Sequence, residues 1–369
     1  MGASYQATVS TGEETIAVRA TKTDPASKLL LVPSVGEYPI YDPLTYKMMV
    51  ADEARNAGYR KAIEEAVPGK VVVEIGTGQD ALWSLHSARS GAARVYAIEA
   101  MPESARLARK AIAEAGYSDV ITVLDGLSTQ VELPERADVC VSEIIGTIGG
   151  SEGAAVVLAD VRARFLKPGG VFVPDRCVTT LAAVDLDRVA PGTELAFQTR
   201  SLRYLRQMFD AVGGPFDPRL CLFGLTEQAL VSDQTEVEDL RFNQPMAAEG
   251  LDRRELTATA DGRVHGFALG IRLWAGQATK PVDSLRDYTN WAPVYVPVSE
   301  AGVPVRAGDR VVLDFRWSPG ADGVHPDYHL YGEIRRADAP NVSFAWHSAH
   351  GGGHFRSSPV YAALFPQAS

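Results

Sequence analysis

Residues 68–78 read PGKVVVEIGTG, and this stretch decides the fold class. After a Pro-Gly turn comes a continuous run of β-branched and apolar residues, which is typical of a strand buried on both faces of a parallel sheet. The run ends in Gly76 and Gly78, and glycines at the carboxyl end of such a strand let the backbone approach a ligand closely. The stretch therefore predicts the first strand of a ligand-binding α/β sheet.

The alternation of strand-like and helix-like segments continues to residue 175. This alternation predicts a doubly wound, Rossmann-like parallel sheet. The strand-like segments are RVYAIEA (94–100), VITVLDG (120–126), DVCVSEI (138–144) and VFVPD (171–175). The helix-like segments include PESARLARKAIAEAG (102–116) and VVLADVRARFLKPGG (156–170), the second ending in a Pro-Gly-Gly turn.

Different patterns flank this region. Upstream, residues 44–66 predict one helix or two abutting helices, stopped by Pro68 and Gly69, and TIAVRA and KLLLVP predict short strands. Downstream of Pro174, period-two alternation predicts an antiparallel domain. We expect three parts: an N-terminal segment with helices (1–67), the α/β domain (68–176) and the β domain (177–369), with a helical arm at about 192–222.

The composition narrows the class of protein. Apolar residues make up 46% of the 369 residues, charged residues 22%, and the net charge is −10. Nucleic acid and anionic membranes are disfavoured as partners because both require a basic face. There is no apolar run of membrane-spanning length and no signal-peptide pattern. Three widely spaced cysteines and the missing signal predict a cytoplasmic protein without a disulfide framework. Arginine outnumbers lysine 28 to 8, which indicates a GC-rich, bacterial genome.

Acidic residues at two strand ends indicate the class of ligand. Glu74 lies in the first strand, and Glu99 ends the second, where an acid can accept hydrogen bonds from both ribose hydroxyls. A dinucleotide-binding turn would carry a third glycine, but the turn continues with Asp80, which would repel a diphosphate. The site therefore favours S-adenosylmethionine, which carries no phosphate and has a sulfonium and an amino group. The alternative is a glycine turn that binds no ligand.

A second motif, SEIIGTIGGSEG (142–153), places Glu143 and Glu152 nine positions apart in a stretch with no other charge. One interpretation is a flexible surface loop with two solvated acids. The other is that the two acids converge on a cation, with small residues between them leaving the loop free to bend. Those small residues include Gly146, Gly149 and Gly150.

The segments KVVVEIGTG, VYAIEA, ADVCVSEI and RFLKPGGVFVPD resemble the core of a class I methyltransferase. More narrowly, the chain resembles the protein arginine methyltransferase family from about residue 38 to residue 317. SEIIGTIGGSEG resembles the double-glutamate loop of that family, DEARNAGYRKAI its cofactor-covering helix, RVHGFALGIRLW a strand pair of its β-barrel, and YTNWAPV its threonine-histidine-tryptophan loop. The loop joined to the barrel is the specific part of this resemblance.

The resemblance implies a role for each matching residue. It implies S-adenosylmethionine as cofactor, S-adenosylhomocysteine as product, no metal, and a homodimer. The cofactor would be bound by Arg55, Glu74, Gly76, Gly78, Glu99, Ser128, Thr129 and Glu143, and the substrate pocket would comprise Tyr38, Tyr41, Met49, Asn290 and Trp291. Open alternatives are that Arg55 is a solvent-facing helix arginine and that Met49 and the tyrosines are core residues.

The catalytic chemistry follows from the substrate group. A guanidinium stays protonated in proteins and spreads its charge over three nitrogens, so it is a poor nucleophile. Two carboxylates can bind it through forked, charge-assisted hydrogen bonds and hold the positive charge on two nitrogens. The third nitrogen then keeps more lone-pair character, and orientation places it in line with the methyl group. We therefore expect Glu143 and Glu152 to be the substrate clamp.

This sequence departs from the family pattern at four positions. Asn290 stands where the family has histidine, Ile144 and Thr147 stand where aromatic residues are usual, and Asp80 replaces the third glycine. A less aromatic loop and a bacterial origin favour free L-arginine or a small arginine-derived metabolite as substrate, in the setting of natural-product biosynthesis. The rivals are a protein arginine methyltransferase, a methyltransferase for another amine or hydroxyl, and a catalytically silent dimeric module.

Two further segments leave alternatives open. In SLRYLRQMFDAVGGPFDP, apolar residues at helical spacing predict a helix that either packs on its own domain or reaches a second subunit. The C-terminal AWHSAHGGGHF places His347, His350 and His354 close together. Such spacing could bind a metal, but its glycine-rich centre favours a hairpin or a mobile tail.

Overall fold

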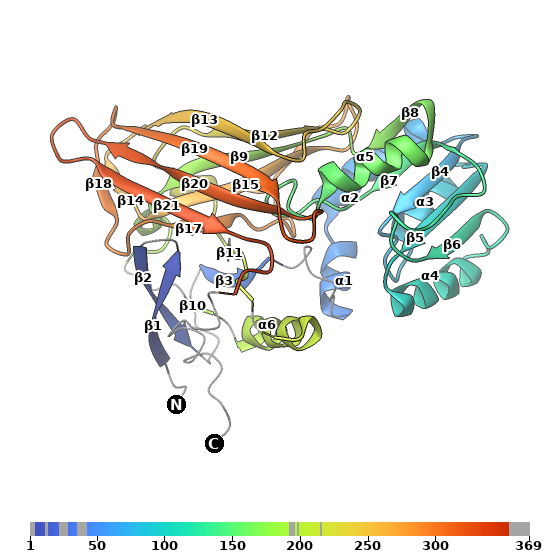
Figure 1. Ribbon diagram of the computed structural model, residues 1–369, viewed down its shortest axis with the longest axis horizontal. Coiled ribbons are helices and arrows are strands. Elements are labelled where there is room, and N and C mark those ends of the chain that lie inside the picture. The colour runs from blue at the N-terminus through green and yellow to red at the C-terminus, as the bar shows by residue number, and fades with distance from the viewer. Residues whose placement is uncertain are drawn as a thin grey trace, which may run out of the picture.

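The computed structural model describes residues 4–11, 14–21, 29–34, 43–191, 196–197, 199–214 and 216–353. Figure 1 shows the parallel sheet and its helices at the right of the molecule and a larger antiparallel β structure at the left, with the helices of residues 43–66 between them. This is the α/β plus β architecture that the sequence predicts.

The parallel sheet has the strand order β6-β5-β4-β7-β8, and every neighbouring pair is parallel. Since the first strand, β4, lies in the middle, the order reverses between β4 and β7, and the carboxyl ends of these two strands form the topological switch point. The strands are β4 (Val71–Ile75), β5 (Arg94–Glu99), β6 (Ile121–Asp125), β7 (Ala137–Ser142) and β8 (Leu166–Val173), and the helices are α3 (Leu82–Arg89), α4 (Pro102–Glu114) and α5 (Ala154–Arg164).

The end of α5 differs from the sequence-based expectation. The helix was expected to run into a Pro-Gly-Gly turn, but it ends at Arg164, and the turn residues lie inside β8. The strand accommodates them through a register shift opposite Ala137–Val139 and through Gly169, which has a φ of 79°. Glycine allows the positive φ that this irregular strand requires, so a local turn signal is overridden by sheet pairing.

The segment 44–66 forms two helices, α1 (Pro43–Val50) and α2 (Glu53–Ala66). Asp52 separates them because its carboxylate caps α2 and accepts a hydrogen bond from the Arg55 backbone amide at 3.0 Å. The second helix ends just before Pro68 and Gly69, as predicted. Helix α2 contacts both β8 and β16, so it joins the two halves of the molecule.

The β domain, as described, contains an eight-stranded and a four-stranded sheet that enclose an apolar core, and two two-stranded sheets, β1-β2 and β14-β18. Pairing is antiparallel except between β3 and β10, and β3 comes from the N-terminal segment. The strands are β1 (Ser4–Thr11), β2 (Glu14–Thr21), β3 (Leu30–Pro33), β9 (Arg176–Val184), β10 (Ala196–Phe197), β11 (Leu220–Phe223), β12 (Thr235–Arg241), β13 (Gly250–Thr257), β14 (Gly262–Val264), β15 (Gly266–Trp274), β16 (Val282–Asp283), β17 (Val294–Pro297), β18 (Val303–Val305), β19 (Arg310–Pro319), β20 (Pro326–Arg335) and β21 (Val342–Ser348).

The predicted arm contains the helix α6 (Thr199–Val212). Its apolar face, which includes Leu205, Met208 and Phe209, is buried within the same chain, where it packs against Leu29 and Leu31. Of the two alternatives, packing on its own domain is therefore the one observed for this face. In the part of the chain that the structure describes, no helix is long and apolar enough to cross a membrane.

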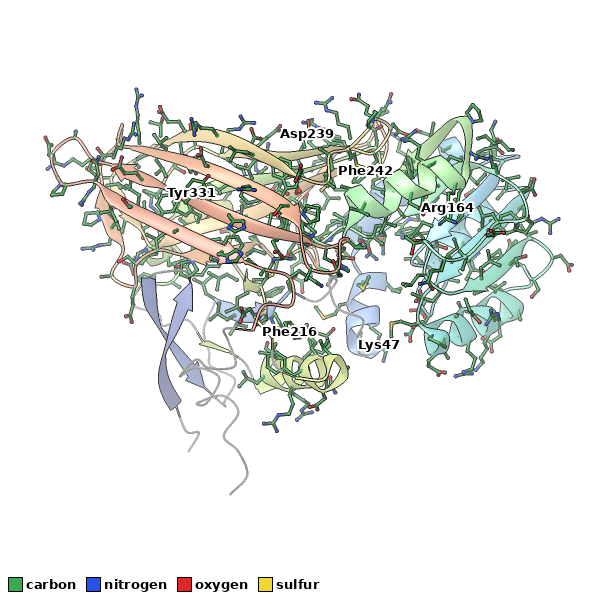
Figure 2. All side chains as sticks on the ribbon, in the orientation of Figure 1. Lys47, Arg164, Phe216, Asp239, Phe242 and Tyr331 are labelled. Carbon is green, nitrogen blue, oxygen red and sulfur yellow. The ribbon has the colours of Figure 1, made fainter. Side chains whose placement is uncertain are left out.

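The two halves meet along α5 and the end of β12. Phe242 is fully buried at this junction, and Figure 2 shows it between the antiparallel strands and α5. The Arg162 guanidinium of α5 donates a hydrogen bond to the Phe242 carbonyl oxygen and stacks on the Phe172 ring, 4.7 Å from its centroid. This contact fixes α5, and hence the loop before it, against the antiparallel β domain, which we call the barrel.

Candidate active site

The glycine turn after β4 lies at the switch point, as the sequence predicts for a nucleotide site. Gly76 and Gly78 have φ values of 74° and 67°, which side chains rarely adopt. The Glu99 carboxylate accepts hydrogen bonds from the Gly78 amide at 2.7 Å and from the Met101 amide at 2.9 Å. Glu99 therefore lies against the glycine turn and fixes its shape.

Glu74 is buried directly beneath this turn. One carboxylate oxygen accepts hydrogen bonds from the hydroxyls of Thr77, at 3.2 Å, and Ser84. The other oxygen, Oε1, has no hydrogen-bond partner among the described residues. Burial raises the pKa of Glu74 to about 8, against the lowering effect of the two hydroxyls. An orphaned, buried carboxylate oxygen can accept a hydrogen bond from a cationic ligand.

The residues expected at the adenine edge follow β6. Ser128 is buried, and its carbonyl oxygen accepts a hydrogen bond from the Arg164 guanidinium, which also donates to Val131. Thr129 is exposed. Ser128 and Thr129 therefore lie at the carboxyl edge of the sheet, on the same side as Glu99, and their cofactor role stays a prediction.

Glu143 begins the loop after β7 and pairs with Arg55 of α2. The Arg55 Nη1 to Glu143 Oε2 distance is 2.6 Å, and the side chains are 4% and 9% exposed. Arg55 also donates to the Met49 carbonyl oxygen at 2.5 Å and lies over the Trp83 ring. The alternative of a solvent-facing Arg55 is therefore wrong. Burial raises the pKa of Glu143 to about 7, although the Arg55 charge opposes the rise.

Glu152 lies just before Gly153, the N-cap residue of α5, and is partly buried. Burial raises the pKa of the nearby Tyr59, and the negative charge of Glu143 raises it further against the opposing charge of Arg55, with Glu152 as the smallest of the contributing charges. Tyr59 donates a hydrogen bond to the Ser142 carbonyl oxygen at 3.1 Å and stacks on Trp83. Tyr59 thus lies at the base of the loop, beside the carboxyl end of β7.

The glycines between the two acids are closely packed, and this corrects the expectation that they leave the loop free to bend. A Cβ atom on Gly146 would lie 1.9 Å from the Ser151 hydroxyl oxygen, and one on Gly149 would lie 2.9 Å from the Cys177 sulfur. One on Gly150 would lie 2.6 Å from Glu238 Oε1. Gly146 is thus packed against the loop's own Ser151, whereas Gly149 and Gly150 are packed against side chains of the barrel.

A loop from the barrel covers the other side of the site. The Asp52 carboxylate accepts hydrogen bonds from the Thr289 hydroxyl at 2.6 Å and the Asn290 amide at 2.8 Å. The Trp291 indole donates to the Ile145 carbonyl oxygen at 2.7 Å. The Asn290 side-chain nitrogen is buried and has no hydrogen-bond partner among the described residues. The loop thus joins α2 to the double-glutamate loop.

The remaining predicted pocket residues are only partly placed. Met49, at the end of α1, is partly buried and contributes its carbonyl oxygen to Arg55. Tyr38 and Tyr41 lie outside the described residues. Sequence reasoning missed Asp52, Tyr59 and Glu238; for Asp52 the signal was an aspartate at a helix start.

The C-terminal histidines do not gather at one point. His347 stacks on His329, with 4.1 Å between the ring centroids, whereas His350 stacks on His325 at 4.2 Å. His354 lies outside the described residues. His325 and His350 lie near Asp322, but that carboxylate already accepts hydrogen bonds from the Val324 and His325 amides in its hairpin turn.

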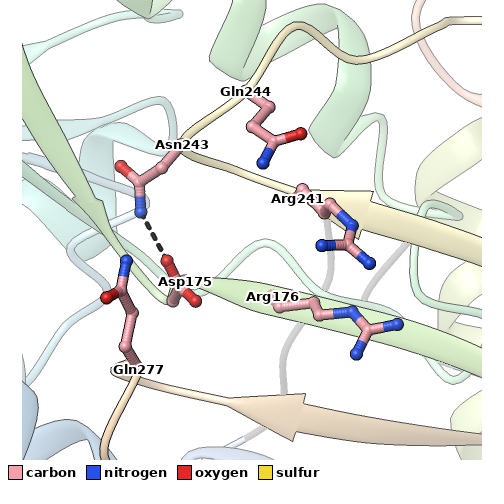
Figure 3. A pocket seen from close by; sticks show the side chains of 6 residues that line it. All are labelled: Asp175, Arg176, Arg241, Asn243, Gln244 and Gln277. Atoms are coloured by element: carbon pink, nitrogen blue, oxygen red, sulfur yellow. Dashed lines mark hydrogen bonds between the residues drawn. The ribbon is translucent and has the colours of Figure 1, made fainter.

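A separate polar hollow of about 320 Å³ lies where β9 and the end of β12 meet (Figure 3). Two of the lining residues are joined by a hydrogen bond that Asn243 donates to Asp175, at 2.8 Å. Its two arginines, Arg176 and Arg241, are both paired with Asp239. The hollow is thus distinct from the glycine turn and the double-glutamate loop.

Comparison with known proteins identifies the family. No protein-family model matches the sequence. An arginine N(omega)-methyltransferase from Streptomyces achromogenes subsp. streptozoticus is 31% identical over 292 residues, which are 75% of this chain and 76% of that protein. Protein arginine N-methyltransferase 1 of Schizosaccharomyces pombe is 27% identical over 310 residues, which are 77% of this chain and 84% of that protein.

Solved structures show the same fold. An enzyme–prozyme heterotetramer of Trypanosoma brucei PRMT1 with AdoHcy matches 82% of this chain and 97% of its own, with a TM-score of 0.65 and 20% identity. Arabidopsis thaliana protein arginine methyltransferase 10 matches 83% and 97%, with a TM-score of 0.66 and 20% identity. With the Streptomyces relative matched over most of both chains, the protein belongs to the arginine N-methyltransferase family.

Proposed function

We propose that this enzyme transfers a methyl group from S-adenosylmethionine to a guanidino nitrogen of free L-arginine or of a small arginine-derived metabolite. The observation that carries the proposal is the ion pair between Glu143 and Arg55. At the carboxyl end of β7, Glu143 already binds a guanidinium through a 2.6 Å contact in a buried setting. Glu152, at the other end of the same loop, is the second acid required to hold a substrate guanidinium.

The cofactor assignment rests on residues of this chain. Glu99 and the glycine turn lie at the switch point, and the Glu74 oxygen without a partner suits the ammonium group of S-adenosylmethionine. When bound, this cofactor supplies an electrophilic methyl group on a sulfonium. Arg55 would hold its carboxylate, and the backbone near Ser128 and Thr129 would meet the adenine.

The protein's own contribution to the reaction is to bind and orient the substrate. Glu143 and Glu152 hold the positive charge of the guanidinium on two nitrogens, so that the third can form the new N–C bond. Bound S-adenosylmethionine would supply the methyl group and keep the electron pair of the S–C bond on sulfur as S-adenosylhomocysteine, and the methylated nitrogen would release its proton to one of the two carboxylates or to water. Exclusion of water by Trp291 and the covering loop strengthens the charge-assisted hydrogen bonds inside the site.

The preference for a small substrate rests on two points. The relative from Streptomyces is named as an arginine N(omega)-methyltransferase, without reference to a protein substrate. The double-glutamate loop carries Ile144 and Thr147 at positions where the family is usually aromatic, and the Thr147 hydroxyl lies 3.1 Å from that of Ser34. The second candidate is a protein arginine methyltransferase, which the similarity to the Schizosaccharomyces pombe enzyme favours.

A competition assay distinguishes these functions. The purified protein receives labelled S-adenosylmethionine with free L-arginine and an arginine-rich peptide together, and the products are separated by mass spectrometry. We expect label on free arginine, and about 10² to 10³-fold slower labelling when Glu143→Gln replaces the wild type. Label on the peptide alone would establish the protein-modifying function. Label on neither, with cofactor binding intact, would mean that the two acids serve a different nucleophile.

A further inference from the structure

Glu238 is a buried acid of the barrel that no step of the proposed reaction uses. It is 2% exposed and lies on β12, opposite β9. The pairing of these strands shifts between Glu236 and Glu238, so Val237 is an extra residue. Val237 and Glu238 are consecutive and both buried, which regular alternation would not allow. The bulge therefore turns Glu238 into the interior.

The Glu238 carboxylate holds the middle of the double-glutamate loop. Its Oε2 accepts hydrogen bonds from the Gly150 amide at 3.1 Å and the Thr179 hydroxyl at 2.7 Å. The same Thr179 hydroxyl oxygen accepts a hydrogen bond from the Gly149 amide at 2.9 Å. Two consecutive amides between Glu143 and Glu152 thus have their partners on the barrel.

Burying the Glu238 carboxylate costs free energy of folding, which indicates that this acid has a role besides stabilising the fold. Burial raises the pKa of Glu238, against the lowering effects of Thr179, the Gly150 amide, Tyr328 and the Arg219 charge. Arg219 is itself fully buried and lies over the Tyr328 ring, 4.9 Å from its centroid. Buried charged groups are weak contributors to stability, and apolar residues of similar size often replace them without loss.

We propose that Glu238, together with Thr179, is a positioning residue for the substrate clamp. By holding the Gly149 and Gly150 amides, it sets the curvature of the loop and hence the separation of the Glu143 and Glu152 carboxylates. The inference rests on the proposed role of those two acids. Cofactor binding should be insensitive to Glu238, because the glycine turn, Glu74 and Glu99 belong to the parallel sheet.

The test uses Glu238→Gln and Thr179→Val in the full-length enzyme, with Glu238→Leu as the stronger change. Glu238→Gln keeps one acceptor oxygen and should be milder than Glu238→Leu. A matched control is Asp185→Asn, because Asp185 is another buried acid that accepts backbone amides, from Asp187 and Arg263, outside the loop. The readouts are hydrogen exchange of residues 144–151, kcat, KM for arginine, and the dissociation constant of S-adenosylmethionine.

We expect Glu238→Leu and Thr179→Val to speed loop-amide exchange at least about tenfold, which corresponds to the loss of one charge-assisted hydrogen bond. We expect kcat to fall by about 10 to 100-fold with cofactor affinity within about threefold, and Asp185→Asn to change neither. Unchanged loop exchange, or unchanged kcat with a lower melting temperature, would overturn the proposal. If the wild type methylates no guanidine, the proposed function fails, whereas the exchange measurement still decides the role of Glu238.

Discussion

Arg55 shows how one side chain joins several parts of the site. Its backbone amide is capped by Asp52, its guanidinium pairs with Glu143, and its Cζ lies 5.8 Å from the centroid of the Trp83 ring. A buried arginine is expensive unless its donors are satisfied, and here the Met49 carbonyl and the neighbouring Asn56 also accept from it. The ion pair with this arginine partly offsets the free-energy cost of burying the Glu143 carboxylate.

At the same scale, we predict that Glu143→Gln and Glu152→Gln each lower kcat by about 10² to 10³-fold, because each removes one charged acceptor for the substrate guanidinium. Cofactor affinity should change by less than about tenfold, since Glu74, Gly78 and Glu99 remain in place. Steady-state kinetics with isothermal titration of S-adenosylmethionine provide both numbers. Equal losses in cofactor affinity and rate would contradict a role in the clamp.

Glu74 and Glu143 make stability depend on pH. Their pKa values are raised from 4.5 to about 8 and about 7, so the folded protein retains protons that the unfolded chain has released. The stabilisation is fully present below pH 4.5 and is lost as the pH rises through 7 and 8. We expect the free energy of unfolding, measured with urea in the absence of cofactor, to fall across this window. Glu74→Gln and Glu143→Gln should each make the free energy of unfolding less dependent on pH in this window. An unchanged dependence in one variant would show that the replaced carboxyl group does not contribute to it.

At the scale of elements, the loop between β7 and α5 and the helix α6 depend on what packs against them. The loop lies close to the barrel at Gly149 and Gly150, where a side chain would collide with barrel residues. Helix α6 has its apolar face covered by β3 and by other residues of the same core, including Phe216 and Leu222. The conformation of the loop and the position of α6 therefore both depend on packing against strands of the larger sheet.

For α6 we predict that Leu205→Asp destabilises the monomer and does not simply dissociate a dimer. Leu205 is fully buried within the chain, so a buried unpaired carboxylate and a lost apolar contact should together cost about 3 kcal/mol or more. Gln207→Asp, on the exposed side of the same helix, is the control. Thermal unfolding and light scattering separate the cases, because a halved mass at an unchanged melting temperature would make this face a subunit interface.

At the scale of the whole molecule, the site depends on contacts between the two halves. Asp52 of the helical segment binds Thr289, which lies 237 positions away in the sequence, and Trp291 binds Ile145 across 146 positions. The Arg162 contact with Phe242 adds a third connection on the other side of the loop. The barrel therefore holds both sides of the double-glutamate loop.

We predict that Trp291→Phe lowers kcat about fivefold to tenfold, because it removes the hydrogen bond to Ile145 while keeping most of the aromatic packing. Trp346→Phe is the matched control, since Trp346 is equally buried but belongs to the core between the antiparallel sheets. Both variants should melt within a few degrees of the wild type. A similar loss of kcat in the two variants would attribute the effect to general packing.

The local sequence pattern was sufficient to predict most helices and strands and to select the candidate acidic residues. The apolar run of β4, the periodicity of α4 and the alternation in β15 and β19 were all readable, because the residues that define each element are adjacent in the chain. The two acids of the loop and the acids at two strand ends were readable for the same reason. The Pro-Gly-Gly segment was misread because sheet pairing outweighed its turn preference.

The sequence by itself determined a doubly wound sheet with a glycine turn, an antiparallel domain after it, and a loop with two isolated acids. Only the tertiary structure decided that Arg55 pairs with Glu143, that α6 packs on its own chain, and that Glu238 supports the loop. Hydrophobic periodicity is a local property and survives in the sequence. The partner of a buried charge is chosen by strand register, a bulge and the packing of distant segments, which no local pattern records.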